Sequence, residues 1–151
     1  MPESIRVFLR DEGPDGRGRR LADVLAFDDT RIEAVHDFIQ WLFPLPEPSQ
    51  AVPGSPVLGR EEAAAIRADP RARAGLRAAL ARMARFYAAT DHWLVRADHN
   101  HRRITRIIAA TRDLLGQEEA VAFHAAVLAR DMAAGGVIDP VSLAYWARTL
   151  G

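Results

Sequence analysis

Apolar residues along this chain recur three or four positions apart, which is the spacing of an amphipathic helix. Strict alternation of apolar and polar residues, the pattern of a half-buried strand, is absent. The clearest helical stripe consists of Leu76, Leu80, Met83, Ala84 and Tyr87. The pattern predicts an all-α protein with about six to seven helices in a single compact domain over residues 21–151. Residues 1–20 are expected to be irregular, with a short extended piece at 7–9.

Start and stop signals divide the second half of the chain into helices. Asp69 and Asp139 each precede a proline, and an aspartate N-cap followed by proline in the first turn is a strong start signal. Asp98 is expected to cap a helix that Gly116 ends in a left-handed conformation. A further helix is expected over 117–133. Its expected inner face consists of Val121, His124, Val127 and Leu128.

The first half contains one strong helix signal and one strong break. Residues 30–33, Thr-Arg-Ile-Glu, form a capping-box pattern. The helix that it opens is expected to run from Arg31 to Phe43, where Pro44 ends it. Five prolines between 44 and 56 then predict an extended connection.

A polar strip runs along the expected helix 31–43. On a helical wheel, one broad side is apolar and extends through Trp41. The strip on the other side consists of Glu33, His36, Asp37 and Gln40. The solvated face of a surface helix would show the same pattern. On an enclosed helix, these side chains must find partners or line a cavity.

A second set of polar residues lies on the expected helix that begins after Asp98. Asn100 falls on its apolar side and needs a hydrogen-bond partner, which a neighbouring loop backbone can also provide. His99 and Arg103 fall at the margin, and Arg106 points toward solvent. We expect the two polar sets to face each other across a crevice, with Arg103 paired to carboxylates.

Three segments carry a family resemblance. Residues 32–45 read Ile-Glu-Ala-Val-His-Asp-Phe-Ile-Gln-Trp-Leu-Phe-Pro-Leu, residues 83–87 read Met-Ala-Arg-Phe-Tyr, and residues 99–107 read His-Asn-His-Arg-Arg-Ile-Thr-Arg-Ile. In order and spacing they resemble the conserved region of the opioid growth factor receptor, from about residue 20 onward. The resemblance implies a helical domain that in animals is part of a receptor for an opioid peptide. We expect a small bacterial relative without the animal tail, which need not bind that peptide, because fold is retained more readily than function.

Composition and charge exclude several kinds of chemistry. The chain has no cysteine and no lysine, which excludes disulfides, thiolate sites and Schiff-base chemistry. Twenty arginines balance twenty acidic residues, so no basic surplus indicates nucleic-acid binding. No apolar run approaches the roughly 20 residues of a membrane span. We expect a cytoplasmic protein without a cofactor, and the oligomeric state stays open.

Three functions remain as hypotheses. The first is a module that binds a peptide or small molecule, with Arg103 or Arg106 holding a carboxylate and Trp41 or Trp93 as an aromatic wall. The second is an enzyme that uses His36 with Asp37, or His99, as acid and base. The third is a metal site. The expected helix after Asp98 disfavours it, because two histidines two positions apart on a helix, such as His99 and His101, diverge by about 200°. Its candidate ligands are His92, Asp98, His99 and His101.

Overall fold

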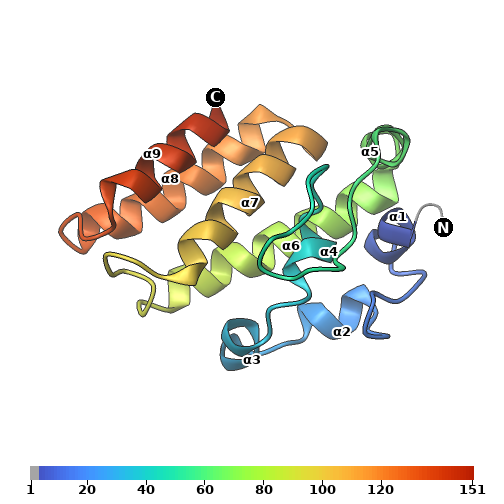
Figure 1. The fold of residues 1–151 in the computed structure, drawn as a ribbon, viewed down its shortest axis with the longest axis horizontal. Coiled ribbons are helices and arrows are strands. Elements are labelled where there is room, and N and C mark those ends of the chain that lie inside the picture. The colour runs from blue at the N-terminus through green and yellow to red at the C-terminus, as the bar shows by residue number, and fades with distance from the viewer. Residues whose placement is uncertain (1–3) are drawn as a thin grey trace. The chain divides into compact units, whose positions relative to one another are not determined.

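The computed structural model describes residues 4–151, and that part of the chain is helical without a strand (Figure 1). Its nine helices are α1 (Ser4–Leu9), α2 (Leu21–Leu25), α3 (Asp29–Ala34), α4 (Ile39–Leu42), α5 (Arg60–Arg67), α6 (Pro70–Ala89), α7 (His99–Leu114), α8 (Gln117–Ala133) and α9 (Pro140–Leu150). The predicted all-α class is confirmed. The number of helices exceeds six to seven because α1 lies in a segment expected to be irregular and because α3 and α4 replace one expected helix.

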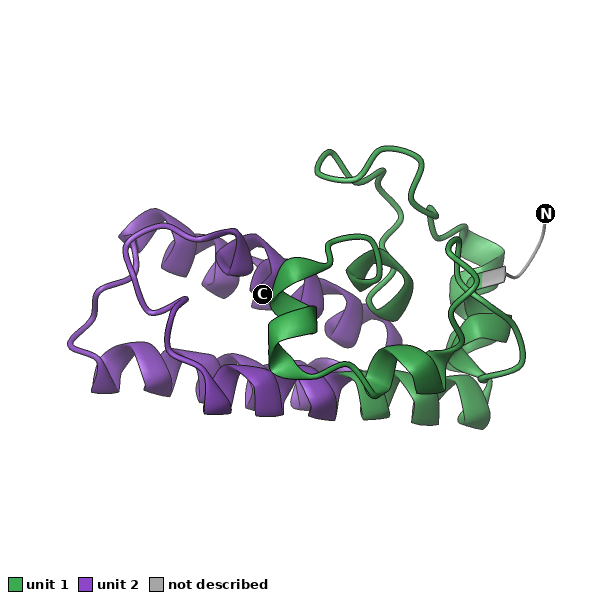
Figure 2. Ribbon diagram, turned by 90° about the horizontal axis from the view of Figure 1, so that it is seen from below, with its two compact units in different colours: residues 1–79 green, residues 80–151 purple. Residues whose placement is uncertain are grey.

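The chain divides into two compact units, residues 1–79 and 80–151 (Figure 2). The division falls inside α6, so this helix contributes to the core of both. Leu76 is fully buried on the first half of α6, and Met83 and Phe86 are fully buried on the second half. No helix within residues 4–151 is both long and apolar enough to cross a membrane.

Residues 4–9 are helical where the sequence predicted irregular structure, whereas residues 10–20 contain no helix, as predicted, and residues 1–3 lie outside the described residues. Residues 4–9 form α1, and the extended piece expected at 7–9 is wrong. Ile5, Phe8 and Leu9 lie at helical spacing and are almost completely buried. Burial of that apolar face stabilises a helix too short to persist by itself.

The single helix expected over 31–43 is wrong as well. Asp28, and not Thr30, caps α3, because its side chain accepts a hydrogen bond from the Arg31 N–H. The helix ends at Ala34, and Val35 is extended with φ −97° and ψ 133°. The Arg19 side chain donates to the Asp37 backbone carbonyl at 3.4 Å in this interruption. A side-chain donor therefore satisfies a carbonyl in the break before α4.

The proline-rich connection between α4 and α5 has no helix, as predicted. The Leu58 N–H donates to the Leu45 carbonyl at 2.8 Å, and Leu58 is buried. A tight turn at Val52–Ser55 places Gly54 at φ 84°, a conformation that glycine adopts without strain. The connection is thus ordered by its own hydrogen bonds.

In the C-terminal unit, α7 packs against both α8 and α9. The predicted caps are confirmed, because the Asp98 carboxylate accepts from the Asn100 N–H and the Asp139 carboxylate from the Val141 N–H. The predicted bounds of α8 are also confirmed, but its predicted inner face is wrong in part. Val121 is 44% exposed. The buried positions of α8 are Ala120, Phe123, Val127 and Asp131.

Candidate functional site

The candidate residues predicted from the sequence fall into two groups, one in each compact unit. Glu33, His36, Asp37, Gln40 and Trp41 belong to residues 1–79, whereas His99, Asn100, Arg103 and Arg106 belong to residues 80–151. The crevice between the groups stays a prediction.

Asp37 is held by two arginines of the loop before α2. Its carboxylate oxygens accept from Arg17 Nε and from Arg19 Nη2, both at 2.9 Å. Partial burial by itself would raise the pKa of the Asp37 carboxyl, but the hydrogen bonds and charges of Arg19 and Arg17 outweigh it, and the pKa lies below its usual value. Asp37 is therefore an ionised structural anchor, poorly suited to accept a proton near neutral pH.

The other polar residues of this group do not form the predicted strip. Glu33 lies on α3 and is half-buried, whereas His36 lies in the interruption after α3 and is exposed. Gln40 lies on α4 with only 5% of its surface exposed. Its side-chain oxygen has no hydrogen-bond partner among the described residues. The break at Val35 rotates these positions away from a common helical face.

Trp41 has a packing role in the first unit. Its ring meets the edge of Phe8, with 5.6 Å between ring centroids. Gly16 lies against the same indole, and a Cβ there would stand 3.6 Å from the ring. Trp41 thus joins α4 to α1 and to the loop before α2.

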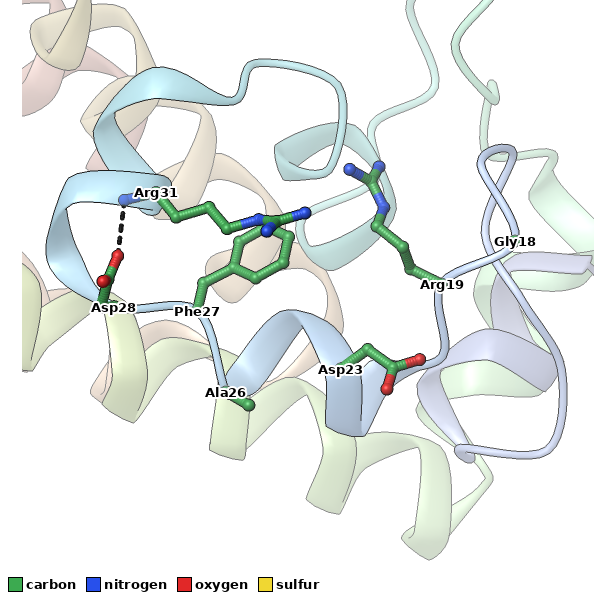
Figure 3. Close-up of a pocket in the computed structure, with 7 residues that line it drawn as sticks. All are labelled: Gly18, Arg19, Asp23, Ala26, Phe27, Asp28 and Arg31. Atoms are coloured by element: carbon green, nitrogen blue, oxygen red, sulfur yellow. Dashed lines mark hydrogen bonds between the residues drawn. The ribbon is translucent and has the colours of Figure 1, made fainter.

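An open pocket of about 520 Å³ lies beside α2 and α3 (Figure 3). It is lined by Gly18, Arg19, Asp23, Ala26, Phe27, Asp28 and Arg31. None of these residues was among the candidates from the sequence. The available signal was an aromatic residue followed closely by an arginine at the start of a helix, which is too common to stand out.

The Arg31 guanidinium lies over the ring of Phe27, with 4.6 Å between its central carbon and the ring centroid. Arg31 is an exposed residue. Its guanidinium has no carboxylate partner among residues 4–151, whereas Arg19 binds Asp15 at 2.7 Å and Asp37 at 2.9 Å. Figure 3 shows the ends of both arginine side chains directed toward the same space. The pocket therefore holds one positive charge that no carboxylate balances directly.

Asn100 belongs to a buried hydrogen-bond chain in the second unit. The Tyr87 hydroxyl donates to Asn100 Oδ1 at 3.0 Å, and Asn100 Nδ2 donates to Asp98 Oδ1 at 2.9 Å. Asn100 is completely buried. The prediction that it needs a partner is confirmed, and these partners give it a role in fastening α6 to the start of α7.

Trp93 and His101 are core residues. Trp93 is completely buried, and its indole N–H donates to the Thr90 carbonyl at 3.0 Å. Trp93 therefore exposes no surface to serve as the aromatic wall that the sequence suggested for Trp41 or Trp93. His101 is 4% exposed, and its Nε2 lies 2.8 Å from the Trp93 carbonyl oxygen. That contact uses one of the two ring nitrogens, and Nδ1 has no hydrogen-bond partner among the described residues.

The remaining candidates on α7 differ in exposure. His99 is exposed, with its Nδ1 3.7 Å from Asp98 Oδ1. Arg103 is 7% exposed. Arg106, expected to point into solvent, is half-buried. In this unit the hydrogen bonds of Asn100 and His101 serve the packing of the fold.

Comparison with known proteins gives one match. The model of the opioid growth factor receptor (OGFr) conserved region matches residues 20–92. No curated protein and no solved structure gives a match. The matched residues include the part of the pocket from Asp23 to Arg31, whereas Gly18, Arg19 and the predicted resemblance over 99–107 lie outside them. Residues 20–92 of this chain belong to the opioid growth factor receptor conserved-region family.

Proposed function

We propose that this chain is a binding module that holds a peptide or small molecule in the pocket beside α2 and α3. The observation that carries the proposal is the exposed Arg31 guanidinium, stacked on Phe27 without a carboxylate partner among the described residues. A concave site with an aromatic surface and a few polar groups is typical of ligand recognition. The matched family takes its name from a receptor, which agrees with a binding role.

An enzyme that uses His36 with Asp37 is less well supported. Both carboxylate oxygens of Asp37 already accept hydrogen bonds from arginine. A general base must reach the proton that it removes and must have a pKa near the working pH. Asp37 would first have to leave both arginines.

The binding proposal is tested by thermal unfolding of the full chain with a panel of short peptides and organic acids. A ligand that binds only the folded chain stabilises it by about 2.7 kcal/mol at a concentration 100 times its Kd. We expect at least one member of the panel to raise the unfolding temperature in a dose-dependent manner. If none does so at millimolar concentration, the proposed function is wrong.

A further inference from the structure

We infer that the group recognised in this pocket is a carboxylate, and that the ligand is an acidic peptide segment. This inference rests on the proposed function and adds the chemistry of the ligand. It comes from the charges around Phe27 and from the partners that these charges already have.

Two guanidinium groups lie near one phenyl ring. The central carbon of Arg31 is 4.6 Å from the Phe27 ring centroid, and that of Arg19 is 6.0 Å from it. Arg19 is already balanced by Asp15 and Asp37. Arg31 is therefore the guanidinium that can bind an added anion, and its planar fork matches a carboxylate.

The acidic residues of the pocket favour a singly charged ligand over a phosphate. Asp23 and Asp28 line the pocket, and one oxygen of each accepts a backbone N–H, from Arg20 at 2.8 Å and Arg31 at 2.8 Å respectively. Their negative charges oppose a phosphate dianion more strongly than a carboxylate. Their second oxygens can accept from N–H groups that flank an acidic side chain. A peptide provides both kinds of group together.

Phe27 prepares Arg31 for this role. The ring supports the guanidinium by a cation–π contact and limits the side-chain freedom that binding would otherwise remove. The backbone N–H of Arg31 donates to Asp28, so replacing the side chain leaves the cap of α3 intact. Arg31 can therefore be altered without removing a known structural contact other than the stack.

The test compares two peptides by calorimetric titration of the full chain at constant ionic strength. Acetyl-Gly-Glu-Gly-amide carries one carboxylate, and acetyl-Gly-Gln-Gly-amide is its uncharged match. We expect the glutamate peptide to bind at least tenfold more tightly, and Arg31→Gln to remove that difference. Arg60→Gln is the matched control, because Arg60 is an exposed arginine at the start of α5, away from the pocket residues. This control should keep the preference.

Two further ligands identify the source of the carboxylate. Acetyl-Gly-Gly with a free C-terminus tests a terminal carboxylate, and inorganic phosphate tests a general anion site. Tighter binding of phosphate than of either carboxylate would overturn the inference, as would equal losses in Arg31→Gln and Arg60→Gln. Tighter binding of the terminal carboxylate would overturn the acidic segment as the ligand, because the carboxylate would then come from a chain end. If peptides bind regardless of charge and of Arg31, the inference fails while the binding function stands.

Discussion

Individual arginines carry much of the polar architecture, because this chain contains no lysine. Arg19 joins the Asp15 and Asp37 carboxylates. Arg130 donates to the Tyr87 carbonyl at 3.3 Å and to the Thr90 carbonyl at 2.7 Å, near the end of α6. Arg31 stacks on an aromatic ring. These roles use the fork and the flat face of the guanidinium, so lysine would be a poor replacement at each.

The buried Tyr87–Asn100 hydrogen bond gives a direct test of stability. Tyr87→Phe removes the donor and leaves Asn100 Oδ1 without that bond in a fully buried position. Loss of one partner of a buried pair costs about 1–2 kcal/mol. We expect that decrease in the free energy of unfolding measured in urea. Tyr145→Phe removes the same group from a residue that is 53% exposed and should have little effect.

The sequence identified a residue whose requirement for a hydrogen bond follows from its position on one helix. It did not identify residues whose role depends on a contact with another element. Asn100 falls on an apolar stripe, and this position alone showed that it must be hydrogen-bonded. Arg31 and Phe27 meet only because the chain turns between α2 and α3. That turn carries no periodicity, so the pocket could not be predicted.

At the scale of the elements, α1 comes very close to α6 at Gly75. A Cβ at this position would overlap the Leu9 carbonyl oxygen, and it would lie 3.0 Å from a Leu21 methyl carbon. Glycine therefore allows the end of α1 to lie directly on the helix. The close approach requires the absence of a side chain and not an unusual backbone conformation.

Gly75→Ala should destabilise the chain, although alanine normally favours a helix by about 1 kcal/mol over glycine. The clash is with backbone, which cannot rotate away, and overpacking typically costs about 1–3 kcal/mol. We expect a net loss of stability in urea unfolding. Gly16→Ala is the control, because its Cβ would make only ordinary contacts with Trp41. Unchanged or increased stability of Gly75→Ala would show that α1 can move.

The Asp69 carboxylate also joins α1 to α6, and we expect this contact to be sensitive to acid. Asp69 accepts from Arg10 Nη1 at 2.8 Å and from Arg6 Nη1 at 2.9 Å. It also accepts from the Ala72 N–H in the first turn of α6. The hydrogen bond from Arg10, together with those from Ala72 and Arg6, lowers the pKa of Asp69 to about 2, against the opposing effect of burial.

Because the pKa is lower in the folded chain, the stabilisation is fully present above the usual value of 3.8 and is lost as the pH falls toward about 2. We expect Asp69→Asn, which can still cap α6, to be less stable than the wild type at neutral pH. The difference should shrink over that acidic interval when unfolding is followed against pH. Asp139→Asn, at the cap of α9, controls for exchanging a capping carboxylate for an amide. A difference that persists to pH 2 would contradict this account.

The element boundaries show how far local signals extend. The caps at Asp69, Asp98 and Asp139 were predicted correctly, because each is a chemical interaction between near neighbours. The helix expected over 31–43 was wrong because the chain is extended at Val35, and Arg19, distant in sequence, binds Asp37 next to that break. Helix propensity alone contains no information about that arginine.

At the scale of the whole molecule, α6 is continuous through the division between the two units. It places Leu76 in the core of residues 1–79 and Phe86 in that of residues 80–151. Melting this helix removes packed side chains from both. We therefore expect the two units to unfold together in one transition.

Tryptophan emission provides the measurement. Trp93 and Trp146 lie in the second unit and Trp41 in the first, so Trp41→Phe leaves emission from the second unit alone. In that variant the urea midpoint from fluorescence should equal the midpoint from circular dichroism, which follows all helices. The wild type, measured in the same way, shows whether the substitution itself altered the transition. Two separated midpoints would show that the units unfold independently.

The stacking of Arg31 on Phe27 also gives the free protein a spectroscopic label. Protons held above an aromatic ring are shifted by its ring current, so the Arg31 side chain should resonate away from ordinary arginine positions in a magnetic resonance spectrum. A second arginine, Arg148, lies 4.7 Å from the centroid of Tyr145 in the other unit and supplies an internal reference. Movement of the first signal while the second stays fixed would report occupancy of the pocket without any added dye.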